Sequence, residues 1–286
     1  MSRYLVVLAW PAGLAVIVGV VLPLARWRAG DCRPAAAPRP GAAPRSGAPA
    51  ALRSAAALAG LAALGAVAVF AVMCLLGVVV TRFGPGVDRP VFAWLQDHQV
   101  PAMVAVMRRL TKIGDTWTTW GAAVAAAACL AVAQRERRWL PPTALAGLIV
   151  ADHYVTLALR HVFHRAGPPA SPLGTFPSGG CDRCVVCYGL IAYLLWREFS
   201  GRRGTALAAA GVVAALGYNE AYSRVYLSLH WLTDALSGLC YGALLLAVFV
   251  AAIRMTAGPA PAARYRPRGA QDRLPKRAAQ LSGQVR

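Results

Sequence analysis

The sequence predicts an all-α integral membrane protein. Of its 286 residues, 58% are hydrophobic and only 14% are charged, which is unlike a soluble globular domain. Several nearly uncharged stretches exceed about 18 residues, the length a helix needs to cross the hydrocarbon core of a bilayer. Basic residues gather beside these apolar stretches rather than within them.

The basic residues are placed as topology signals. Twenty of the 30 lie in four segments, at 26–53, 135–138, 197–203 and 254–286, each flanking an apolar run. This pattern is typical of positive-inside topology and of attraction to anionic head groups. The net charge of +19 does not indicate nucleic acid binding, because the chain has no aromatic-interleaved basic groove and no nucleic-acid module.

The first two elements precede the main apolar region. Residues 1–25 predict an N-terminal transmembrane helix, with an apolar run at 4–25 that is too long for a cleavable signal and lacks a small-residue cleavage site. Residues 26–53 are rich in Pro, Ala and Arg, which predicts a flexible, basic cytoplasmic linker.

The region 54–253 predicts six further membrane helices. They are expected at 54–80, 117–134, 141–159, 181–196, 205–222 and 230–253. Prolines and charges interrupt the segment 83–116, which predicts short amphipathic helices lying at the membrane interface. The basic tail 254–286 has little apolar content, so we expect it to be disordered and cytoplasmic.

Charge bias also predicts which segments share a side of the membrane. With the linker in the cytoplasm, all four basic segments fall on the cytoplasmic side, as the positive-inside rule requires, whereas Arg108, Arg109 and Lys112 fall outside. The segments 160–180 and 222–230 then meet on the extracytoplasmic face. Both carry residues suited to binding or attacking a phosphate.

The strongest chemical signal is the stretch from Ser223 to Asp234. Arg224 offers a forked, permanently charged donor that suits phosphate oxygens. His230 follows, and Asp234 comes four residues later. One helical turn separates these two, which predicts that the carboxylate holds one ring nitrogen while the other serves as nucleophile or base.

A second signal lies upstream, at Ser178, Gly179 and Gly180. These small residues form a turn that opens a helix, and a helix N-terminus is a ready anion site. Asp182 and Arg183 follow in the first helical turn. They are either a simple cap and an interfacial anchor or members of the site.

The residues Ser223, Arg224, His230 and Asp234 resemble the third motif of the type 2 phosphatidic acid phosphatase superfamily, which also includes vanadium haloperoxidases. That motif is Ser-Arg, five residues, His, three residues, Asp, and it is met here at every fixed position. The resemblance covers about 54–253. It implies a six-helix phosphatase-like transmembrane core, to which the N-terminal helix is an addition, and chemistry that needs neither metal nor cofactor.

The first motif of that family, Lys, six residues, Arg, Pro, is met only loosely. Arg160 stands where the family has Lys, and Gly167 replaces the second cation before Pro168. Arg165 or Arg183 could substitute for the missing charge.

The resemblance implies a role for each matching residue. His230 would attack phosphorus to give a phosphohistidine, with Asp234 orienting its ring. Arg160, Arg224 and the Ser178–Gly180 amides would hold the phosphate oxygens. The implied enzyme is a lipid phosphatase or phosphotransferase. Charge bias predicts that its site lies on the extracytoplasmic face, and we expect the protein in the plasma membrane.

The second motif, Pro-Ser-Gly-His, lacks its proton-donating histidine because Gly180 takes that place. Three readings stay open. In the first, Asp182, His161 or His164 supplies the proton. In the second, the leaving group is itself a phosphate, as in a prenyl or polyprenyl diphosphate, which predicts a preference for diphosphate over monophosphate lipids. In the third, the chain is an eroded, noncatalytic protein that binds phospholipid or assists assembly.

Two further ionisable residues, Asp152 and His153, lie inside an apolar run. Such residues in membranes are either functional or held by an interhelical hydrogen bond, for which Asn219 and Glu220 are candidate partners.

Overall fold

The protein is described by a computed structural model in which the placed residues are 48–134, 137–169, 171, 175–200 and 203–257. Every regular element within these ranges is a helix, which confirms the predicted all-α class. The expected N-terminal helix, most of the linker and most of the basic tail lie outside the described residues, so these three assignments stay predictions.

The helices follow one another closely along the chain. They are α2 (Ala48–Phe83), α3 (Pro85–Asp97), α4 (Pro101–Leu110), the 3-10 turn η1 (Thr111–Gly114), α5 (Thr116–Ala133), α6 (Leu140–Phe163), α7 (Gly179–Leu195), the π turn η2 (Trp196–Ser200), α8 (Arg203–Tyr226) and α9 (Leu232–Ala257).

The six expected membrane helices of the core are all present as α2 and α5 to α9. Among the described helices, α2, α5, α6 and α9 are long and apolar enough to cross a membrane. The expected spans at 181–196 and 205–222 do not meet the same measure. Helix α7 has only 17 residues, and α8 carries polar side chains such as Asn219 and Glu220 in its last turns.

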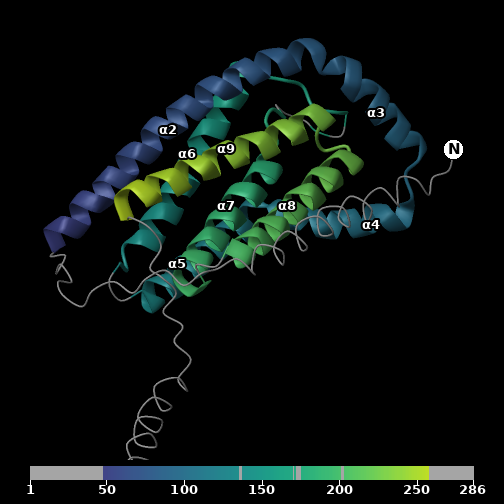
Figure 1. Ribbon diagram of the computed structural model, residues 1–286. Coiled ribbons are helices and arrows are strands. Elements are labelled where there is room, and N and C mark those ends of the chain that lie inside the picture. The colour runs from purple at the N-terminus through teal and green to yellow at the C-terminus, as the bar shows by residue number, and fades with distance from the viewer. Residues whose placement is uncertain (1–47, 135–136, 170, 172–174, 201–202, 258–286) are drawn as a thin grey trace, which may run out of the picture.

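Helix α7 lies in the middle of the bundle and packs against α5, α6, α8 and α9 (Figure 1). The long helix α2 runs along the outside and contacts α9 and α6. Its buried residues recur every three or four positions, whereas the apolar Leu64 and Leu75 are about 70% exposed. A single buried stripe beside exposed apolar side chains suits a helix that faces lipid. The stripe consists of Leu58, Ala62, Ala66, Val69, Met73, Gly77 and Val80.

The expected short helices between 83 and 116 are α3, α4 and η1. They fold over one end of α8, where Tyr226 packs against Met103 and Met107 and its hydroxyl accepts a hydrogen bond from the Val100 amide at 2.9 Å. This packing fixes η1 and the start of α5 beside the last turn of α8.

Two helix ends differ from those expected from the apolar runs. Helix α2 begins at Ala48, inside the expected linker, and α9 continues to Ala257, inside the expected tail. Pro49 sits in the first turn of α2, where proline is tolerated, and the Ala- and Leu-rich residues after it are strong helix formers. Helical propensity therefore carries α2 past the limit of its apolar run.

Candidate active site

Residues of all three motifs lie at one end of the helix bundle. Arg160 lies in the last turn of α6, Gly179 begins α7, and Arg224 lies in the last turn of α8. Asp234 lies in the first turn of α9. A backbone hydrogen bond of 3.1 Å from the Ser178 amide to the Asp234 carbonyl joins the start of α7 to the start of α9. The fold thus brings together segments that are far apart in sequence.

The N-terminus of α7 is built to accept an anion. Ser178 is its N-cap residue in an extended conformation, and its side chain makes no capping bond. The Ser178 hydroxyl is buried and has no hydrogen-bond partner among the described residues. The first amides of a helix also lack partners within the helix and carry partial positive charge. An anion at this end would satisfy both.

Three guanidinium groups surround the two glycines that begin α7. A Cβ atom on Gly179 would stand 2.9 Å from Arg160 Nη2 and 3.0 Å from Arg183 Nη1, and one on Gly180 would stand 2.7 Å from Arg224 Nη2. A side chain at either position would make these guanidinium groups shift. Arg160 Nε is also buried without a partner in the described part of the chain. Three like charges this close favour a bound polyanion.

The structure separates the two proposed substitutes for the missing first-motif cation. Arg183 lies against Gly179, with the other arginines of the site. Arg165 is instead bound elsewhere: it donates to Asp88 Oδ2 at 2.5 Å, and it also donates to the Asp234 carboxylate. Arg183 is therefore the residue positioned to replace that charge.

His230 lies in the short turn between α8 and α9, where Ser228 adopts a left-handed conformation with φ of 57°. Its Nδ1 is 3.1 Å from the Thr175 carbonyl oxygen. A carbonyl can only accept, so Nδ1 carries the proton and Nε2 keeps a free lone pair. The turn thus presents a neutral imidazole with an unprotonated nitrogen.

The structure corrects the expected contact between His230 and Asp234. Helix α9 begins at Leu232, so His230 precedes the helix and the two residues are not on successive turns of it. The Asp234 carboxylate accepts hydrogen bonds from Arg165 and from the Trp231 amide, and the Thr175 carbonyl orients the ring in its place. Asp234 fixes the turn rather than the imidazole.

Burial and the positive charges of Arg224 and Arg160 lower the pKa of His230 to about 3. Each of these effects disfavours a charged imidazolium. His230 is consequently neutral across the physiological range, as a nucleophile must be.

This shift predicts a pH-dependent stability. An unfolded chain binds a proton on His230 below its ordinary pKa of about 6.5, whereas the folded chain does not until about pH 3. The folded protein therefore loses stability from this group as the pH falls, by about 2 kcal/mol at pH 5. Denaturant unfolding in detergent at pH 7 and pH 5 should show a larger loss for the wild type than for His230→Asn. Equal losses would contradict the assignment.

Two carboxylates that hold Arg224 were not expected. Glu220 Oε1 accepts from Arg224 Nε at 2.6 Å, and its Oε2 accepts from the Gly114 amide at 3.2 Å. Asp115 Oδ1 accepts from Arg224 Nη2 at 3.0 Å. The spacing of Glu220 and Arg224 by one helical turn could have indicated the first pair. Nothing local marks Asp115, which lies 109 residues from Arg224.

The ion pair between Glu220 and Arg224 occupies the space of the missing second-motif histidine. A Cβ on Gly180 would stand 2.6 Å from Glu220 Oε1, and Glu220 is fully buried. Any side chain at position 180 would have to displace the ion pair. The glycine is thus coupled to the way in which Arg224 is held.

The residues expected to replace that histidine lie in different surroundings. Asp182 is buried and faces α6, where it accepts from Thr156 Oγ1 at 3.3 Å. His161 and His164 are exposed, and their rings contact each other with centroids 6.2 Å apart.

Asp152 and His153 also lie in different surroundings. Asp152 is buried, with its Oδ1 unpartnered among the described residues, whereas His153 is exposed and contacts the ring of Trp120. Glu220, one expected partner, is bound to Arg224 instead.

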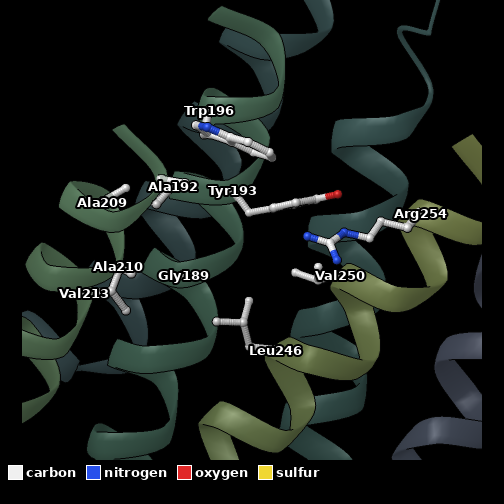
Figure 2. A pocket seen from close by; sticks show the side chains of 11 residues that line it. Gly189, Ala192, Tyr193, Trp196, Ala209, Ala210, Val213, Leu246, Val250 and Arg254 are labelled. Carbon is white, nitrogen blue, oxygen red and sulfur yellow. The ribbon is translucent and has the colours of Figure 1, made fainter. Parts of the chain in front are cut away.

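A separate hollow of about 240 Å³ lies between α7, α8 and α9 (Figure 2). It is lined by the later turns of α7 and α9 and the earlier turns of α8, so it lies toward the ends opposite His230. Its walls are largely apolar, with the Arg254 side chain beside Tyr193. It is distinct from the candidate active site.

The family model that matches this chain is that of the PAP2 superfamily, over residues 58–257. This match covers more than half of the chain and includes every residue of the candidate site. The chain belongs to the PAP2 superfamily. The resemblance carried by Ser223, Arg224, His230 and Asp234 is thereby confirmed.

This PAP2 protein is similar to phosphatidylglycerophosphatase B of Bacillus subtilis (strain 168), with 33% identity over 102 residues, which is 33% of this chain and 49% of that relative. The matched segment therefore spans about half the length of the curated relative. Its fold resembles the crystal structure of the first transmembrane PAP2 type phosphatidylglycerolphosphate phosphatase from Bacillus subtilis, with a TM-score of 0.58 and 21% identity, covering 65% of this chain and 94% of that one. The PAP2 protein is thus an integral membrane protein with the fold of a transmembrane phosphatase.

Proposed function

We propose that this PAP2 protein is a membrane phosphatase that removes the terminal phosphate of a lipid through a phosphohistidine on His230. The observation that carries the proposal is the convergence of Arg160, Arg183 and Arg224 on the first turn of α7, beside a neutral histidine. Phosphoryl transfer depends chiefly on charge stabilisation and positioning, and this site supplies both.

Each group has a defined part in the proposed reaction. The three guanidinium groups and the α7 amides hold the nonreacting phosphate oxygens. The Nε2 lone pair of His230 attacks phosphorus while the bond to the lipid oxygen breaks. Water then attacks the phosphohistidine to release phosphate. Asp234 is a positioning residue that ties the His230 turn to Arg165 and to the start of α7.

The proposed substrate is a lipid that ends in a phosphate monoester or a diphosphate. The similarity to phosphatidylglycerophosphatase B favours phosphatidylglycerophosphate, a monoester. The missing histidine at Gly180 favours a prenyl or polyprenyl diphosphate, whose phosphate leaving group needs less protonation. We place the protein in the plasma membrane with this site on the extracytoplasmic face, because the basic segments flank the opposite helix ends.

The purified full-length protein tests this function directly. Phosphate release should be measured from phosphatidylglycerophosphate and from a polyprenyl diphosphate in mixed micelles without added metal. We expect turnover of at least one of them, and no turnover of either would overturn the enzymatic proposal. The competing function, a noncatalytic phospholipid-binding protein, predicts binding without turnover, with the binding weakened by Arg224→Ala.

A further inference from the structure

An aspartate with no recognised role points at the phosphate site. Asp115 is the N-cap residue of α5, with an extended backbone. Aspartate at this position usually accepts a hydrogen bond from an amide in the first turn of its own helix, but the Asp115 side chain makes none. Its Oδ1 instead accepts from Arg224 Nη2 at 3.0 Å. The side chain is thus committed to the site rather than to its helix.

Asp115 lies within reach of the place where the second-motif histidine is missing. Arg224 Nη2 is 2.7 Å from the point at which a Cβ on Gly180 would stand. The same Nη2 is 3.0 Å from Asp115 Oδ1, so the carboxylate is no more than about 6 Å from that point. A histidine at position 180 would extend its ring over much of this span. The carboxyl is therefore the acidic group of α5 that lies within about 6 Å of the place where the imidazole would begin.

The two other carboxyl groups nearby are less suited to proton transfer. Both oxygens of Glu220 take hydrogen bonds, from Thr111 and Arg224 on one side and from the Gly114 amide on the other, and the residue is fully buried. Asp182 is also buried and faces α6. The Asp115 side chain is 49% exposed, so it can exchange a proton with water between turnovers.

We infer, building on the proposed function, that Asp115 is the general acid and base of this enzyme. As the bond from His230 Nε2 to phosphorus forms and the bond to the lipid oxygen breaks, the Asp115 carboxyl gives its proton to that oxygen. Its carboxylate then takes a proton from water as the water oxygen bonds to phosphorus and the N–P bond breaks. Phosphate, neutral His230 and a protonated Asp115 result.

The variant Asp115→Asn tests this role, because an amide keeps an oxygen for Arg224 but cannot give up a proton. The readout is kcat on two substrates of different leaving groups. Phosphatidylglycerophosphate expels an alkoxide, which needs the acid, so kcat should fall about 10²–10⁴-fold. A polyprenyl diphosphate expels a phosphate, so its kcat should fall less than about 10-fold. Asp115→Glu should recover part of the monoester activity, and Asp97→Asn, which changes an exposed aspartate of α3, is the control.

The outcomes separate this inference from the function on which it rests. Equal losses on both substrates would make Asp115 only an anchor for Arg224 and would overturn the inference, as would no loss at all. A wild-type protein that cleaves the diphosphate but not the monoester would overturn it too. In each of these cases the phosphatase proposal stands. That proposal fails only if the wild type cleaves neither substrate.

Discussion

Replacing His230 by alanine should abolish phosphate release, with kcat falling at least about 10⁴-fold, the order seen when a covalent nucleophile is removed. The imidazole lies in a turn whose backbone is held independently of it, through the carbonyls of Val225 and Arg224. The Thr175 carbonyl loses one hydrogen bond, which costs about 1 kcal/mol. The variant should therefore fold and still bind a lipid phosphate.

The measurement is phosphate release together with acid-labile labelling of the protein by a ³²P-labelled substrate. Wild-type protein should carry the label and the His230→Ala variant should not. His153→Ala is the matched control, because His153 is exposed on α6 and takes no part in the site. Persisting turnover or labelling in the His230→Ala variant would remove His230 as the nucleophile.

Replacing Arg165 by methionine should destabilise the fold by about 3–5 kcal/mol, the usual cost of removing one partner of a buried ion pair. Arg165 is bound to Asp88 and Asp234, whose side chains are 1% and 0% exposed. The Arg165 guanidinium also donates to Thr233 Oγ1 at 2.9 Å. Without the guanidinium, two carboxylates remain buried with no cation between them.

Unfolding of the purified variants in detergent checks this expectation. Arg89→Met removes an exposed arginine of α3 and should cost less than about 0.5 kcal/mol. Adding Asp88→Asn to Arg165→Met should recover part of the loss, because one of the unpaired charges is then gone. An Arg165→Met protein as stable as the wild type would mean that the three residues do not form a buried cluster.

Gly180 and Asp115 predict different substrate preferences. Gly180 alone predicts a diphosphate preference, because a histidine acid is absent. Asp115 restores a proton donor and predicts that a monoester is also cleaved. Comparing wild-type rates on the two lipids distinguishes a site that avoids the need for an acid from one that has replaced it.

The membrane class, the helix order and the main site residues could be predicted locally. An apolar run long enough to cross a bilayer almost always forms a membrane-spanning helix. The helices expected at 54–80 and 117–134 follow directly from such runs. The spacing of Arg224, His230 and Asp234 identified the family because these residues lie close together in the sequence, within one short motif. The start of α2 and the end of α9 lie outside the predicted limits, because a helix can continue beyond its apolar part.

The partners of those residues depend on contacts between distant segments. The sequence predicts that His230, Arg224 and the glycine-rich turn come together at one end of a bundle of membrane helices. The packing of distant helices, in contrast, puts the Thr175 carbonyl against His230, Arg165 against Asp234, and Arg183 beside Gly179. It also brought Asp115 to Arg224 across 109 residues. Such pairings follow from how helices pack, and no local spacing records them.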